Sequence, residues 1–69
     1  IQAMLAELGG RIEHFRKEKG LSQQQLATAS QLDRSYVSAV EHGKQNVSFA
    51  TLKNLSDALD VNIAELITD

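Results

Sequence analysis

Apolar residues recur along this chain at the three- and four-residue spacing of amphipathic helices, and polar residues that cap helices stand between the apolar series. Four times, an apolar residue directly precedes such a cap and another follows the cap by four positions: Leu21–Ser22 with Leu26, Leu32–Asp33 with Val37, Val47–Ser48 with Leu52, and Val61–Asn62 with Leu66. A side-chain oxygen at each cap can accept a hydrogen bond from an unpaired backbone N–H, and the apolar pair packs as a hydrophobic staple. Ser22 with Gln25 and Asn62 with Glu65 also fit the reciprocal capping box. The pattern predicts helices at about 22–30, 33–41, 48–59 and 62–67.

A fifth helix precedes these four. Its apolar stripe is formed by Leu5, Leu8, Ile12 and Phe15. Lys17 and Lys19 then stand where the helix macrodipole favours cations, and Gly20 supplies the left-handed residue that ends many helices. We expect Gly9–Gly10 either to fray or to mark the true start of this helix. Because no alternation of strand period exceeds three residues, the predicted fold is all-α, with five short helices around one core.

Length and composition limit the chain to one small domain, placed at residues 1–69. It has 69 residues, no cysteine and only two histidines, so we expect no disulfide, metal site or cofactor. No run of about 18 apolar residues is present, and the opening stretch lacks the positive cluster of a signal peptide. We therefore expect a cytoplasmic protein. The chain begins with Ile1, which leaves open whether residues precede it.

Charge is unevenly distributed. The net charge of −2 argues mildly against a nucleic-acid partner, since phosphates attract cations. Residues 1–33 are neutral, residues 34–56 carry +2 and residues 57–69 carry −4. The basic middle would suit a DNA contact with the acidic tail turned away, and an ordinary solvated surface explains the same pattern.

The second and third predicted helices are separated only by Ser30–Leu32, so they must cross steeply, as in a helix-turn-helix at about 22–41. Five apolar side chains would hold the pair together: Leu26, Ala27, Leu32, Val37 and Val40. Four others would point outward: Arg34, Ser35, Ser38 and Ala39. This short face carries no carboxylate and is able to enter a groove. An αα-hairpin within a plain helical bundle fits the spacing equally well.

The segments RKEKGLSQQQLA, LDRSYVSAVEHGK and TLKNLSDALDV resemble the DNA-binding domain of the phage repressor and Cro class, the XRE family. The resemblance covers about Leu8 to Ile67. Within that family, LDRSYV followed by E-x-G and NVS is similar to the controller proteins of restriction–modification systems. The resemblance implies a five-helix repressor-like fold and a sequence-specific transcriptional regulator that binds double-stranded DNA with its recognition helix in the major groove.

The resemblance also implies roles for individual residues. Arg34, Ser35, Ser38 and Ala39 match positions that face base edges. Arginine suits guanine O6 and N7, and the Ala39 methyl suits a thymine methyl. Phosphate contacts are implied for Gln23, Tyr36, His42, Lys44, Gln45, Asn46 and Ser48. Gln23 is also expected to brace the first recognition side chain. Arg16 and Glu41 match a structural salt bridge between the first and third helices.

Two departures from the family pattern affect these expectations. Gln31 stands where the family usually has glycine, and a left-handed conformation there would cost roughly 1–2 kcal/mol. Gln45 and Asn46 stand where a cation would strengthen phosphate binding, so one monomer should bind DNA weakly and a homodimer on a palindromic operator is expected. The predicted dimer interface comprises Val61, Ile63 and Ile67. Alternatively, Ile63 and Ile67 cover the core of their own chain.

Other functions fit less well. His14 and His42 lie on different predicted helices without the Asp or Cys neighbours of a catalytic or metal site, so an enzyme is not expected. A core this small leaves no room for a small-molecule effector. The main alternatives are an antitoxin-type regulator whose chief partner is another protein, and the DNA-binding fragment of a larger repressor. The sequence specifies neither the operator nor whether the protein represses or activates.

Overall fold

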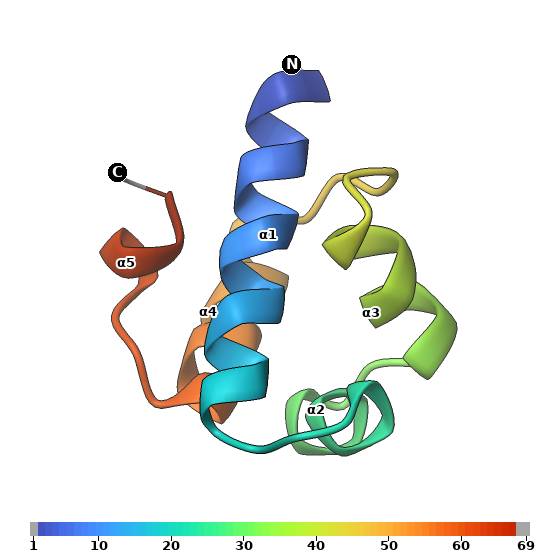
Figure 1. Ribbon diagram of the computed structural model, residues 1–69, viewed down its shortest axis with the longest axis vertical. Coiled ribbons are helices and arrows are strands. Elements are labelled where there is room, and N and C mark those ends of the chain that lie inside the picture. Colours follow the sequence, from blue (N-terminus) through green and yellow to red (C-terminus); the bar gives the residue numbers. More distant parts are fainter. Residues whose placement is uncertain (1, 68–69) are drawn as a thin grey trace.

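A computed structural model describes residues 2–67, which contain five α-helices and no strand (Figure 1). The helices are α1 (Gln2–Glu18), α2 (Gln23–Ser30), α3 (Arg34–Glu41), α4 (Phe49–Leu59) and α5 (Ile63–Ile67). The predicted all-α, five-helix fold is confirmed, and each of the four predicted starts falls on the residue that directly precedes a helix. None of the described helices is long and apolar enough to cross a membrane.

The predicted caps differ in how they bond. Ser22 accepts from the backbone N–H of Gln25 while the Gln25 side chain accepts from the backbone of Ser22, which confirms this capping box. Ser48 accepts from Thr51 N in the same way. Asp33 makes no side-chain cap bond, so the prediction for its carboxylate is wrong. The start of α3 therefore depends on its apolar contacts rather than on a cap.

Four helices end with one repeated geometry, in which a residue with positive φ is followed by a backbone N–H that bonds five residues back. The positive-φ residues are Gly20, Gln31, Gly43 and Asp60. Gln31 has φ 61°, so the position is left-handed and the cost considered for a residue other than glycine applies there. Leu21, Leu32 and Val61 each follow such an end and directly precede the next cap. One apolar residue thus closes a helix and opens the next, which explains the short turns.

Helix α1 runs without interruption through Gly9–Gly10, so the expectation of fraying or a start there is wrong. The reason is tertiary. Gly9 is buried against the C-terminal end of α3, where a Cβ would lie 2.6 Å from the carbonyl oxygen of Glu41 and closer still to that of Val40. Helices α1 and α3 therefore approach each other closely because position 9 has no side chain.

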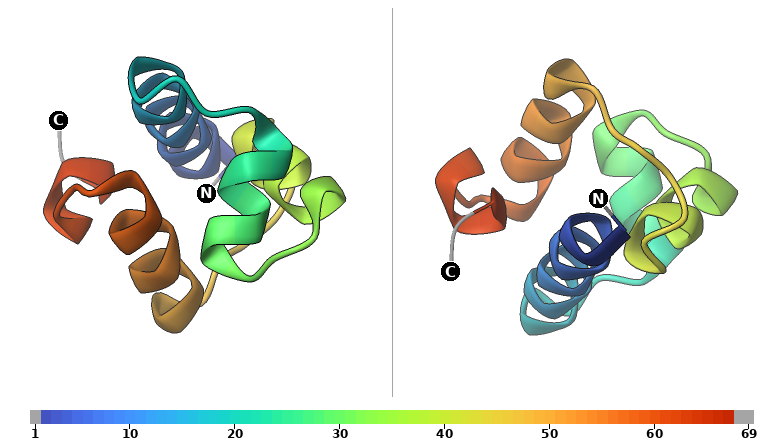
Figure 2. Two further views of the ribbon diagram at one scale, coloured as in Figure 1. Left: turned by 90° about the horizontal axis from the view of Figure 1, so that it is seen from below. Right: turned by 90° about the horizontal axis from the view of Figure 1, so that it is seen from above.

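The core is formed by one side of every helix. Its buried apolar residues are Ile12, Leu26, Ala27, Val37, Val40, Leu52, Leu55, Leu59 and Leu66. Helix α3 packs against α1 and α2, while α5 packs against α1 and α4. Helices α3 and α5 consequently lie on opposite sides of the molecule (Figure 2). The domain measures 27 × 22 × 21 Å.

Candidate nucleic-acid interface

Helices α2 and α3 form the helix-turn-helix unit. The turn is Gln31–Asp33, in which Leu32 N donates to the carbonyl oxygen of Ala27 at 2.8 Å. Leu26 and Ala27 of α2 are buried together with Val37 and Val40 of α3, and Leu32 packs beside them. These contacts fix the angle at which α3 projects from the body, so its outer face is presented on a rigid support.

The outer face of α3 carries the four predicted base-contact residues. Arg34 and Ser35 are exposed, and Ser38 and Ala39 are half-buried one turn further on. In the part of the chain that the structure describes, the Arg34 guanidinium makes no hydrogen bond or ion pair. Its five N–H donors are therefore available to an external acceptor. The face is short, lacks carboxylates and starts with a cation, features that are compatible with entry into the major groove.

A buried ion pair connects the far end of α3 to α1. Arg16 Nε donates to Glu41 Oε2 at 2.6 Å, and Arg16 Nη2 donates to Glu41 Oε1 at 3.1 Å. Arg16 Nη1 also donates to the carbonyl oxygen of Leu21. The hydrogen bond to Glu41 raises the pKa of Arg16 above its ordinary value, although burial opposes this shift. The structure thus contains the salt bridge that the family resemblance implies.

Gln23 joins this pair instead of bracing Arg34. Its Nε2 donates to Glu41 Oε1 at 3.0 Å, which ties the first residue of α2 to the last residue of α3. The expected contact between Gln23 and the first recognition side chain is therefore absent. Since an amide nitrogen carries two hydrogens, Gln23 retains one N–H that faces away from Glu41 and suits a phosphate oxygen.

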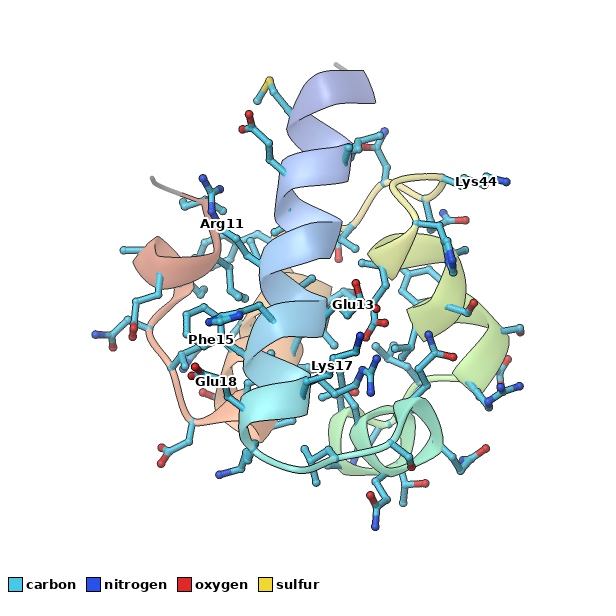
Figure 3. The ribbon with its side chains drawn as sticks, viewed as in Figure 1. Arg11, Glu13, Phe15, Lys17, Glu18 and Lys44 are labelled. Carbon is cyan, nitrogen blue, oxygen red and sulfur yellow. The ribbon has the colours of Figure 1, made fainter. Side chains whose placement is uncertain are left out.

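The loop between α3 and α4 places a cation beside the C-terminal end of α3. Lys44 points away from the body at the top of α3, and Gln45 and Asn46 beside it are exposed (Figure 3). Half-buried Tyr36 donates its hydroxyl to the carbonyl oxygen of Asn46 at 3.2 Å. Tyr36 thus holds the loop against α3, and its phosphate contact stays a prediction.

Ser48 and Phe49 stand where the loop meets α4. The Ser48 hydroxyl donates to Thr51 Oγ1 and accepts from Thr51 N, so it is occupied as a cap. Any contact of this helix start with a phosphate would therefore use its backbone N–H groups. Phe49 is 73% exposed, which sequence analysis missed. The available signal was its position directly after the cap, outside the Leu52–Leu55–Leu59 stripe.

The predicted dimer residues differ in exposure. Val61 and Ile63 are half-buried and pack against the core of their own chain, while Ile67 is 55% exposed. Ile67 lines a shallow apolar groove with Met4, which is 71% exposed. Arg11 of α1 lies beside this groove and donates to the carbonyl oxygen of Leu66 at 3.3 Å (Figure 3).

Comparison with known proteins identifies the domain. A family model described as helix-turn-helix matches residues 12–66, most of the chain. The chain belongs to the helix-turn-helix family of the XRE and Cro type. This confirms the predicted family. Members of this helix-turn-helix family are DNA-binding transcriptional regulators and not enzymes, and the chain shares that character.

Relatives of this helix-turn-helix domain include controller proteins. Control protein C.MunI from Mycoplasma sp is 42% identical over 62 residues, which cover 88% of this chain and 84% of the relative. Control protein C.SmaI from Serratia marcescens is 38% identical over 68 residues, covering 99% and 77%. The crystal structure of the restriction-modification controller protein C.AhdI from Aeromonas hydrophila superposes with a TM-score of 0.91 at 48% identity, covering 93% of this chain and 97% of that one.

The helix-turn-helix fold groups the predicted site residues in space. The base-contact residues and Gln23 belong to the helix-turn-helix unit itself, and His42 and Lys44 follow at the end of α3. The loop residues Gln45 and Asn46 extend the same side toward the start of α4. Ile67 lies apart from this surface, on the helix opposite α3 (Figure 2).

Proposed function

We propose that residues 1–69 form one DNA-binding domain, which acts as a homodimer on a palindromic operator with α3 in the major groove. The features of the outer face of α3 are the main support for this proposal. Among the described residues, Arg34 at the start of this face has no hydrogen-bond or ion-pair partner. The face carries no carboxylate, and buried contacts with α1 and α2 hold α3 rigidly. In this arrangement Arg34, Ser35, Ser38 and Ala39 face base edges, while Gln23 and the loop at 44–48 contact phosphates.

Arg34 and Lys44 separate these two kinds of contact. Arg34→Ala is expected to weaken binding to the specific site by about 1–3 kcal/mol and to relax the preference at one base pair in each half-site. Lys44→Ala should weaken all sequences alike and reduce the slope of log Kd against log salt by about one unit per monomer. Titrations of labelled specific and random duplexes by fluorescence anisotropy measure both effects. Equal losses on the two duplexes for both variants would contradict this division of roles.

The need for two copies follows from how little DNA one copy contacts. One short recognition helix with few cations gives weak binding at physiological salt, and pairing doubles both kinds of contact. Because α5 lies opposite α3, pairing through α5 leaves both recognition helices free. For a domain 22 Å across, such a dimer can space its two α3 helices by roughly 34 Å, one turn of DNA. The acidic residues near α5 would then lie away from the phosphates.

Ile67 is the residue of the predicted interface that is most available to a second copy. Ile67→Glu is expected to yield monomers in sedimentation velocity and to abolish cooperative DNA binding, because it places two carboxylates in an isologous apolar contact. Its helix content should stay nearly unchanged by circular dichroism, since the side chain is exposed. A variant that remains dimeric, or a wild-type protein that is monomeric at tens of micromolar, would refute pairing through this face.

The closer role that we propose is that of a controller in a restriction–modification system. Three relatives named as controller proteins support it, because they match the chain over most of its length. The experiment is a gel shift with duplex from upstream of the protein's own gene and of the adjacent genes. A shift that unlabelled duplex of the same sequence reverses, but a scrambled duplex does not, is the expected result.

A further inference from the structure

His42 lies at the end of the recognition helix, on its outer face. It is exposed and directly follows α3 as the C-cap residue. At 100° per residue, His42 falls on the same face as Ser38 one turn earlier and Ser35 two turns earlier. The imidazole therefore continues the row of side chains that faces DNA in the proposed complex, at the place where that row meets Lys44.

A hydrogen bond fixes which ring nitrogen faces outward. His42 Nδ1 lies 2.7 Å from the carbonyl oxygen of Ser38. Because a carbonyl oxygen only accepts, Nδ1 must carry a hydrogen in both the neutral and the charged ring. The neutral ring then presents a lone pair at Nε2, which repels a phosphate. The charged ring presents an N–H donor there instead.

Each charged group around His42 either forms a hydrogen bond or ion pair within the protein or is a cation. On α3 itself, Glu41 bonds Arg16 and Gln23, and Arg34 lies two turns away. From α1, the charges toward α3 are Arg16, Glu13 and Lys17, and Lys17 Nζ lies 3.2 Å from Glu13 Oε2. Helix α2 contains no charged residue, and the adjacent loop contributes Lys44.

We propose that His42 is a proton-dependent phosphate contact, in which the charged imidazole donates Nε2–H to a DNA phosphate oxygen. This inference rests on the proposed function. An anionic partner in the complex favours the charged ring, so DNA binding takes up a proton. His42 therefore contributes to affinity while its ring is charged, and this contribution is lost when the ring becomes neutral at higher pH.

The test uses random-sequence duplex DNA, since a phosphate contact needs no operator. Anisotropy titrations of the wild type at pH 6 and pH 8, each at several salt concentrations, give Kd and its salt slope. Kd is expected to be roughly three- to tenfold tighter at pH 6 than at pH 8, the contribution of one phosphate contact at moderate salt. The slope of log Kd against log salt should be steeper at pH 6 by about 0.9 per monomer.

Three variants test whether His42 causes the pH dependence of DNA binding. His42→Gln should lose both pH effects and bind at pH 6 as the wild type does at pH 8. His42→Lys should bind tightly at both pH values, because its charge is permanent in this range. His14→Gln is the matched control: His14 lies on α1 with Nε2 3.4 Å from Glu18 Oε2, and this variant should keep the wild-type pH dependence.

The outcomes separate the two proposals. If His42→Gln keeps the pH dependence, or if the wild type binds DNA equally well at both pH values, the inference about His42 is wrong while DNA binding stands. If the wild type fails to bind duplex DNA at low salt at either pH, the proposed function itself is contradicted. Should His42→Gln fail to fold, pH-independent tight binding by His42→Lys supports the inference, and pH-dependent binding overturns it.

Discussion

Replacing Gly9 with alanine is expected to destabilise the domain by roughly 3 kcal/mol, because the added methyl has no space between α1 and α3. The obstructing atoms are the backbone carbonyl oxygens of Val40 and Glu41, which cannot move aside as a flexible side chain would. A chain of this length has a total stability of about 3–10 kcal/mol, so this loss would leave much of the protein unfolded. Urea denaturation followed by circular dichroism measures it.

Gly10 provides the matched control within the same helix. It is exposed, and apart from the backbone of its own helix no described atom would lie within 4 Å of an added Cβ. Gly10→Ala should therefore raise the free energy of unfolding by about 0.5–1 kcal/mol, the ordinary gain of alanine over glycine in a helix. If the two substitutions change stability by similar amounts, then the close approach of α1 to α3 at position 9 is not a feature of the protein in solution.

Glu41→Ala is expected to cost about 3–5 kcal/mol, because it leaves the Arg16 guanidinium buried without its carboxylate. The substitution also removes the acceptor of Gln23 and thus loosens α1 and α2 from the end of α3. DNA affinity should fall along with stability, since the position of α3 depends on this network. Thermal unfolding and anisotropy titration measure the two losses.

The exposed pair of Lys53 and Asp57 is the comparison for this buried one. Lys53 Nζ lies 2.7 Å from Asp57 Oδ1, and both side chains are more than half exposed. Lys53→Ala should change the free energy of unfolding by less than about 1 kcal/mol, as is usual for exposed pairs. A cost for Glu41→Ala no larger than that for Lys53→Ala would show that the network does not hold the helices together.

Local features of the sequence were sufficient for much of the fold. The four helix starts were predictable because a cap and its staple lie within five residues of each other. Gln31 was singled out as a possible left-handed position because the family usually has glycine there, while the same geometry at Asp60 was missed because no family contrast marked that position. Continuity of α1 through Gly9 was not predictable, since it depends on a contact with residues more than 30 positions away.

The candidate site likewise combines features that the sequence predicts with contacts that only the structure shows. The exposure of Arg34 and Ser35 follows from helical periodicity together with the buried positions of Val37 and Val40. The partner of Gln23 lies 18 residues away, and the partner of Tyr36 is a backbone carbonyl in the next loop. Neither contact has a local signal. The sequence thus indicated which side chains face outward, whereas the structure showed which of them hold one another in place.

Methylation interference tests most directly whether α3 lies in the major groove with Arg34 on a guanine. The method compares duplexes methylated at guanine N7, in the major groove, with those methylated at adenine N3, in the minor groove. For the wild type, N7 methylation of one guanine in each half-site should block binding, and this interference should disappear in Arg34→Ala. Interference confined to adenine N3, or an unchanged guanine pattern in Arg34→Ala, would contradict the account.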